Sequence, residues 1–310
     1  MLMDYQLQPP SCLVMGSPGS GKTDALATLI EAGLETFVLV TEPDGIGSLI
    51  DSVQRRKLDI NMLHWSVCQP AAQGWESLKS LADTVGRFTF EELKGEKSSK
   101  GKEHTRGPGM KIITSLANFH CDRTNRDYGP IDKFNANRAI VLDSLTGLNM
   151  IAFMLSVGHK SNPHQGEWGV AMNFVEQVIL KLTSDRSCYL VVTGHLERET
   201  DEIEGRTVTT VSTLGKKLAP RLTRFFSDIV LARRKIEDGK AKFTWATIDP
   251  FAELKNRNLP LDANLTQSFV PIVKSYSRRL EAAGLTPPPP PPEPVAAAPT
   301  LTPHLTKQQP

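Results

Sequence analysis

Short apolar runs alternate along the chain with stretches in which apolar residues recur every three or four positions. The runs predict buried strands and the periodic stretches predict amphipathic helices. The runs cover residues 12–15, 36–40, 139–142 and 189–193, and helical periodicity is found at 24–32, 46–53, 75–85 and 168–182. This alternation predicts an α/β fold with a mainly parallel sheet flanked by helices.

The pattern changes in the C-terminal third, where we expect a β-rich extension. Residues 206–211, 228–232 and 242–247 read as strands, and Glu-Asp-Gly-Lys at 237–240 reads as a hairpin turn. A last helix is expected at 272–283, ending at Gly284. We expect one domain over 1–284, with a mobile, polar, glycine-rich loop at 94–109, and a disordered proline-rich tail at 285–310.

Trp168 has two interpretations. It could form a base-stacking platform for nucleic acid, or it could begin the buried face of a helix. The spacing favours the buried face, because apolar residues follow Trp168 at helical intervals at positions Met172, Val175, Ile179 and Leu182.

The charge balance gives no global field for nucleic acid, since 36 basic and 34 acidic residues leave a net charge of +2. The four cysteines are far apart and read as reduced core thiols. The start lacks a signal sequence and no stretch approaches a membrane span, so we expect a soluble, cytoplasmic protein that does not contact a membrane.

The strongest chemical signal is a complete phosphate loop, Gly-x-x-x-x-Gly-Lys-Thr, between the first strand and the first helix. Glycines let the backbone N–H groups wrap a phosphate, Lys22 reaches the β and γ phosphates, and Thr23 offers a hydroxyl to Mg²⁺. The sequence therefore predicts that ATP and Mg²⁺ bind at Gly16, Ser17, Pro18, Gly19, Ser20, Gly21, Lys22 and Thr23.

Four further residues are candidates for the chemistry of a bound triphosphate. Asp143 directly follows an apolar strand, where such NTPases hold Mg²⁺ through a carboxylate; the alternative is a capping aspartate. His195 follows the strand at 189–193 and either contacts the γ-phosphate or is a solvated loop histidine. Lys255 and Arg257 read, from the residues alone, as two exposed cations on a loop.

Together these segments resemble a RecA-type ATPase core, and more narrowly the phage-encoded RecA-like ATPases of the Sak-four group, which are described as single-strand annealing recombination proteins. The resemblance covers about residues 10–260 and is carried by the phosphate loop, Leu-Val-Thr-Glu at 39–42, Val-Leu-Asp-Ser-Leu-Thr at 141–146, Val-Thr-Gly-His at 192–195 and Lys-Asn-Arg at 255–257.

The resemblance implies roles for individual residues. Glu42 would polarise the attacking water, and Lys255 and Arg257 would reach the γ-phosphate of a neighbouring subunit. Segments 157–166 and 197–214 would correspond to DNA-binding loops. Acidic residues outnumber basic ones in the second segment, which argues against direct phosphate contact there.

The resemblance implies an ATP-hydrolysing homo-oligomer, a ring or a filament, that acts on single-stranded DNA in phage recombination or annealing within the infected host cell. The tail is either an inert end or a tether for a single-strand binding protein. Two alternatives stay open. One is a hexameric DNA-translocating motor, disfavoured because the phosphate loop begins about 15 residues from the start. The other is a slow nucleotide-binding scaffold that works through its tail.

Overall fold

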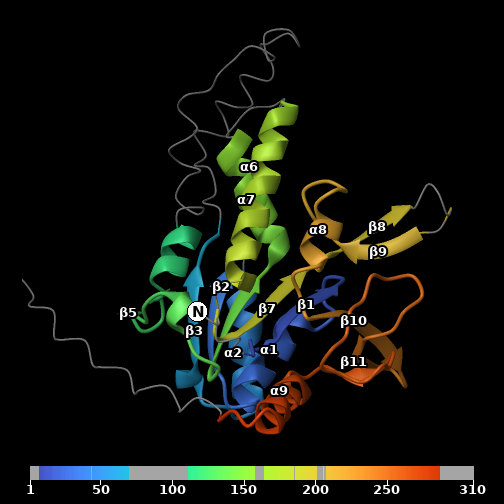
Figure 1. Cartoon of the computed structure of the whole chain (residues 1–310). Coiled ribbons are helices and arrows are strands. Elements are labelled where there is room, and N and C mark those ends of the chain that lie inside the picture. The colour runs from blue at the N-terminus through green and yellow to red at the C-terminus, as the bar shows by residue number, and fades with distance from the viewer. Residues whose placement is uncertain are drawn as a thin grey trace, which may run out of the picture.

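An eight-stranded sheet organises the chain, with strand order β12-β11-β10-β1-β7-β6-β2-β3 in the computed structural model (Figure 1). The structure describes residues 7–42, 44–69, 111–157, 164–184, 186–200, 205 and 207–286. Strands from β10 to β3 pair in parallel, whereas β11 and β12 add an antiparallel edge beyond β10.

The central strands are buried on both faces, which explains their continuous apolar runs. β1, β2 and β7 are buried at every position. The strands of the sheet are β1 (Ser11–Gly16), β2 (Glu35–Val40), β3 (Leu63–Val67), β6 (Arg138–Asp143), β7 (Tyr189–Gly194), β10 (Asp228–Glu237), β11 (Lys240–Ala246) and β12 (Leu265–Thr266).

Helices cover both faces of the sheet because successive strand residues point to opposite sides. Leu13 and Met15 join one apolar core with α6 (Leu145–Val157), α7 (Gln165–Ser184) and α8 (Ala219–Thr223). Cys12 and Val14 join the other core with α1 (Lys22–Glu31), α2 (Gly45–Arg55) and α9 (Val270–Ala282). Two short antiparallel pairs, β4 (His120–Cys121) with β5 (Arg126–Asp127) and β8 (Leu196–Thr200) with β9 (Thr207–Val211), lie outside the main sheet.

The predicted α/β class, with its parallel sheet, flanking helices and β-rich C-terminal part, is confirmed. The hairpin turn is also confirmed: β10 and β11 pair from Glu237 and Lys240, and Asp238 and Gly239 both have positive φ. β3, α6 and β8 were not predicted. The periodic stretch 75–85, the loop 94–109 and residues 287–310 of the tail lie outside the described residues. Among those described, no helix combines the length and apolarity needed to cross a bilayer.

The expectation for Trp168 is only partly met. Val175, Ile179 and Leu182 are buried as expected, but Trp168 is 37% exposed. Its ring packs against Phe153 of α6, with centroids 4.6 Å apart. The first turns of α7 extend past the sheet beside α6 (Figure 1), so this end of the apolar stripe has no sheet to cover it.

Candidate nucleotide-binding site

The phosphate loop connects the end of β1 to the start of α1. Gly19 and Gly21 have φ of +69° and +86°, in the left-handed region that favours glycine. At Gly16 a Cβ atom would lie 2.9 Å from the carbonyl oxygen of Ala232 on β10. Gly19 and Gly21 are therefore required for the backbone conformation of the loop, and Gly16 for the close packing of β1 against β10.

The groups around this loop suit a bound anion. Gly21 provides no side-chain cap for α1, so the first N–H groups of that helix have no acceptor from a cap. The Ser20 hydroxyl is buried without a hydrogen-bond partner among the described residues. Lys22 curls back over the loop, and its Nζ donates to the carbonyl oxygens of Gly16 at 2.8 Å and Ser17 at 3.1 Å. Burial lowers the pKa of Lys22. These donors fit a polyphosphate.

Thr23 and Asp143 meet beside the loop, as Mg²⁺ coordination requires. The Thr23 hydroxyl donates to Asp143 Oδ2 at 3.0 Å, and the hydroxyl of Thr193 on β7 donates to Oδ1. Asp143 is buried, and desolvation raises its pKa, with the nearby Glu42 charge adding to the effect. A buried carboxylate beside a hydroxyl is the oxygen donor set that Mg²⁺ prefers. The residues present therefore fit the ion.

Glu42 and His195 lie together at the same edge of the sheet. Glu42 follows β2, and its Oε1 accepts a hydrogen bond from the Ser144 hydroxyl that follows β6. His195 follows β7, and its Nε2 lies 3.2 Å from the same Oε1. Because β2, β6 and β7 are parallel, their carboxyl ends bring these side chains to the edge that holds the phosphate loop. This contact places His195 beside Glu42, and its role toward a γ-phosphate stays a prediction.

Lys255 and Arg257 lie at the opposite end of the sheet. Lys255 Nζ donates to the Arg224 carbonyl oxygen at 3.2 Å, and the Arg257 N–H donates to Asp228 Oδ1 at 2.9 Å. Asp228 begins β10, while Ala232 is the residue of β10 that pairs with Gly16. Four residues of strand correspond to about 13 Å. Within one chain the two cations are therefore separated from the phosphate loop.

The structure describes only parts of the two segments that are expected to act as DNA-binding loops. Half of 197–214 belongs to an antiparallel strand pair, in which β8 pairs with β9 and Leu196 lies opposite Val211. Of 157–166, the structure describes the end of α6 at Val157 and the residues from His164 onward. The strand expected at 206–211 corresponds to β9, and a DNA-binding role for 197–214 stays a prediction.

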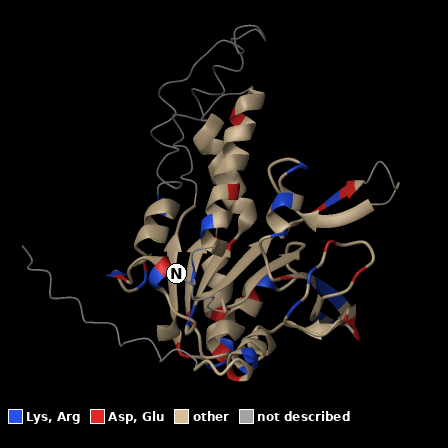
Figure 2. Cartoon of the chain, viewed as in Figure 1, with Lys and Arg blue, Asp and Glu red and all other residues tan. Residues whose placement is uncertain are grey.

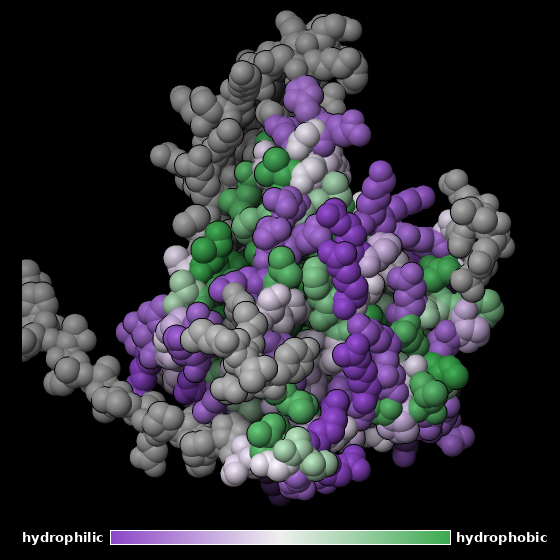
Figure 3. Space-filling view, in the orientation of Figure 1, coloured by the Kyte–Doolittle hydropathy of each residue, from purple (hydrophilic) through white to green (hydrophobic). Residues whose placement is uncertain are grey.

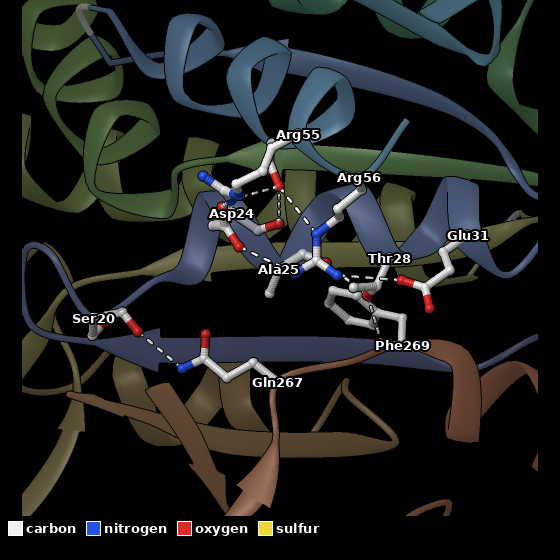
Figure 4. A network of polar contacts seen from close by, with 10 residues as sticks. Ser20, Asp24, Ala25, Thr28, Glu31, Arg55, Arg56, Gln267 and Phe269 are labelled. Carbon is white, nitrogen blue, oxygen red and sulfur yellow. Dashed lines mark hydrogen bonds and ion pairs between the residues drawn. The ribbon is translucent and has the colours of Figure 1, made fainter. Parts of the chain in front are cut away.

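Contacts that the sequence does not signal hold α1 in place (Figure 4). Asp24 pairs with Arg55 and Arg56 at the end of α2. On the other side, Gln267 Nε2 donates to the carbonyl oxygens of Ser20 at 2.9 Å and Thr244 at 3.0 Å. The phosphate loop is thereby tied to β11 by one buried amide, which no motif or spacing could reveal.

Replacing Asp143 by asparagine distinguishes between its two possible roles, as a metal ligand or as a capping residue. The raised pKa means that the folded protein keeps this proton when the unfolded chain has already lost it, so stability falls as the pH rises through the raised value. Asparagine does not ionise, so the variant does not lose stability in this way. We expect the melting temperature of the nucleotide-free protein at pH 7 to stay the same or rise by a few degrees, and its decline as the pH rises from the ordinary aspartate pKa toward neutrality to flatten. If Asp143 is a metal ligand of an ATPase, Mg²⁺-dependent ATP hydrolysis should fall by about 100-fold or more.

Thermal unfolding over this pH range, with steady-state ATPase rates at pH 7, makes the measurement. The charge of Lys22 lowers the pKa of Asp143, whereas that of Glu42 raises it. Variants of Lys22 are therefore unsuitable as controls. Asp132→Asn, on the short 3-10 helix Ile131–Lys133, is a matched control. A melting temperature that drops by ten degrees or more would instead support the capping role.

Neither a family model nor a curated protein matches the chain. Among solved structures, it is similar to the RadB recombinase, with 14% identity, a TM-score of 0.38 and coverage of 76% of this chain and 80% of that one. It is also similar to the KaiC-like protein PH0186 from the hyperthermophilic archaeon Pyrococcus horikoshii OT3, with 8% identity, a TM-score of 0.31 and coverage of 76% and 77%. Similarity at this level does not assign a family, so function has to be inferred from the site itself.

Proposed function

We propose that the protein is a RecA-like ATPase that hydrolyses ATP with Mg²⁺. The observation that carries this proposal is the convergence of Lys22, Thr23, Asp143, Glu42 and His195 at one edge of the sheet. They come from a phosphate loop and three other strand ends, and the contacts among them join Thr23 to Asp143 and Glu42 to His195. A structural role alone does not require a lysine, a buried acid and a second carboxylate to meet there.

Each residue has a role that follows from its chemistry. The backbone of Gly16–Thr23 and the side chain of Lys22 would bind the phosphates. Thr23 and Asp143 would hold Mg²⁺, whose charge would offset that of the phosphate oxygens. Glu42 orients the attacking water as a general base. His195, in contact with Glu42, lies where it can hydrogen-bond the γ-phosphate.

We further propose that the protein works as a homo-oligomer, a ring or a filament, in which Lys255 and Arg257 reach the nucleotide of a neighbouring copy. Their position at the far end of β10 supports this role, since they are too distant to act on their own loop. From the resemblance of the sequence to RecA-type ATPases, we further propose that the assembly acts on single-stranded DNA in phage recombination or annealing. We also propose that the proline-rich tail can tether a single-strand binding protein.

The test of ATPase function is Lys22→Ala. Loss of the ammonium removes a direct phosphate contact, so nucleotide affinity should fall and turnover should become undetectable. ATP hydrolysis, with and without single-stranded DNA, and equilibrium binding of ADP measure the two effects.

Lys133→Ala, at an exposed lysine of the 3-10 helix Ile131–Lys133, serves as the control for charge loss. An ATPase rate close to that of the unaltered protein in Lys22→Ala would contradict the proposal and place the active site elsewhere. Stimulation by single-stranded DNA would support the recombination role, and strand displacement would point to a motor instead.

A further inference from the structure

The β10–β11 hairpin lies beside the phosphate loop and extends beyond the end of β1. β10 pairs with β1 up to Ala232, opposite Gly16, and its last residues run on to Glu237. Arg234 of β10 and Phe243 of β11 are directly opposite in the antiparallel register, so their side chains share one face of the hairpin. Figure 2 shows the basic residues of this hairpin.

Both side chains of this pair lie against the loop. A Cβ placed on Gly19 would be 3.2 Å from Arg234 Nη1, and one placed on Gly21 would be 3.0 Å from Phe243 Cδ1. The aromatic ring nevertheless stays 42% exposed. An exposed ring and a guanidinium therefore border the two glycines whose backbone is in the left-handed region.

Arg234 differs from its neighbours in having no ion pair or side-chain hydrogen bond to any described residue. Arg233 pairs with Asp249, and Lys235 donates to Asn264 Oδ1 at 2.7 Å. The charge of Arg234 is thus available to a ligand. A cleft of about 450 Å³ is bordered by Ser17, Pro18 and Ser20 of the loop as well as by Arg234, while Phe243 lies next to it against Gly21.

The order of the strands sets which end of a nucleotide would face the hairpin. β1 lies between β7 and β10. Asp143, Glu42 and His195 all lie on the β7 side, where the proposed function places Mg²⁺ and the γ-phosphate. The nucleoside end of a triphosphate bound along the loop then extends toward β10 and β11.

We propose that Arg234 and Phe243 bind the nucleoside end of the nucleotide, with Phe243 stacking on the base and Arg234 contacting the phosphate nearest the ribose. The inference rests on the proposed function, because it concerns the same ligand. Stacking on an aromatic ring is tolerant of base identity, since every base has a π-face. We therefore expect similar affinity for adenine and guanine nucleotides.

Nucleic acid is the other ligand that this surface could take. Ile236 is 78% exposed and Phe251 is 63% exposed, and Figure 3 shows hydrophobic side chains in this part of the surface. The position of Phe243 against Gly21 favours a nucleotide, because the ring lies at the loop rather than farther out with Ile236. Binding of single-stranded DNA is an outcome that the experiment separates.

The experiment compares equilibrium binding of a non-hydrolysable ATP analogue and of inorganic tripolyphosphate to the full-length protein. Phe243→Ala should bind the analogue about tenfold more weakly and tripolyphosphate unchanged, because only the analogue has a base to stack. Arg234→Gln should weaken both ligands several-fold. Phe243→Tyr, which keeps the ring, should bind the analogue as the unaltered protein does. Unchanged binding of tripolyphosphate by Phe243→Ala excludes a folding defect as the cause.

Ile236→Ala and Lys242→Gln, on the same hairpin, are the matched controls and should bind both ligands normally. The inference is overturned if Phe243→Ala matches these controls, or if it loses affinity for single-stranded DNA while keeping that for the analogue. It is also overturned if both ligands weaken equally in Phe243→Ala. Failure of the unaltered protein to bind the analogue at all would instead remove the proposed function, and this inference with it.

Discussion

Replacing Glu42 by glutamine is expected to lower the kcat of ATP hydrolysis by about two orders of magnitude or more while leaving ATP binding intact. Glutamine has the shape of glutamate, and its amide oxygen can still accept the hydrogen bond from Ser144. It cannot accept a proton from water, however, so the loss falls on the chemical step. Steady-state kinetics and equilibrium binding of an ATP analogue measure the two quantities separately.

A matched control for this variant is Glu281→Gln on α9, an exposed glutamate remote from the loop. It should leave kcat unchanged. If Glu42→Gln weakens analogue binding and leaves turnover intact, Glu42 is a binding residue and the assignment of the general base is wrong.

Mixing Arg257→Ala with Lys22→Ala protein is expected to restore activity that neither variant has alone. In a mixed assembly, some sites combine the intact phosphate loop of an Arg257→Ala subunit with the intact Lys255 and Arg257 of a Lys22→Ala subunit. Loss of a charge that stabilises the transition state in trans costs about three orders of magnitude in related enzymes, so even partial rescue is measurable. ATPase rates over a range of mixing ratios provide the measurement.

Arg278→Ala, on the exposed side of α9, controls for the loss of a surface cation and should keep its activity without mixing. Co-assembly of the two variants has to be demonstrated by pull-down of one tagged partner. Absence of rescue in co-assembled protein would show that Arg257 does not complete a neighbouring site.

The parts of the site that the sequence predicts are those encoded locally. The phosphate loop is one continuous segment whose glycines are needed for its backbone conformation, so eight neighbouring residues determine its structure. Asp143 follows directly from its place at the end of a buried strand. Both inferences need only a strand, a turn and the chemistry of the residue types.

The remaining parts depend on strand order, which a single sequence does not contain. Glu42 and His195 meet only because β2 and β7 lie on either side of β6 in the sheet. Gln267 reaches Ser20 across 247 positions of sequence, and no periodicity marks it. The sequence does not predict α6 because its apolar residues are nearly continuous, so they do not recur at the three- or four-residue spacing that marks a helix.

The placement of the two halves of the proposed site at opposite ends of β10 has a consequence for stoichiometry. A contact between one end of a protomer and the other end of the next is heterologous, so it either closes into a ring or grows without limit. In a ring every phosphate loop has a donor neighbour, whereas an open polymer always leaves one terminal loop incomplete. Specific activity per subunit would therefore be independent of assembly length for closed rings and would rise with length for open polymers.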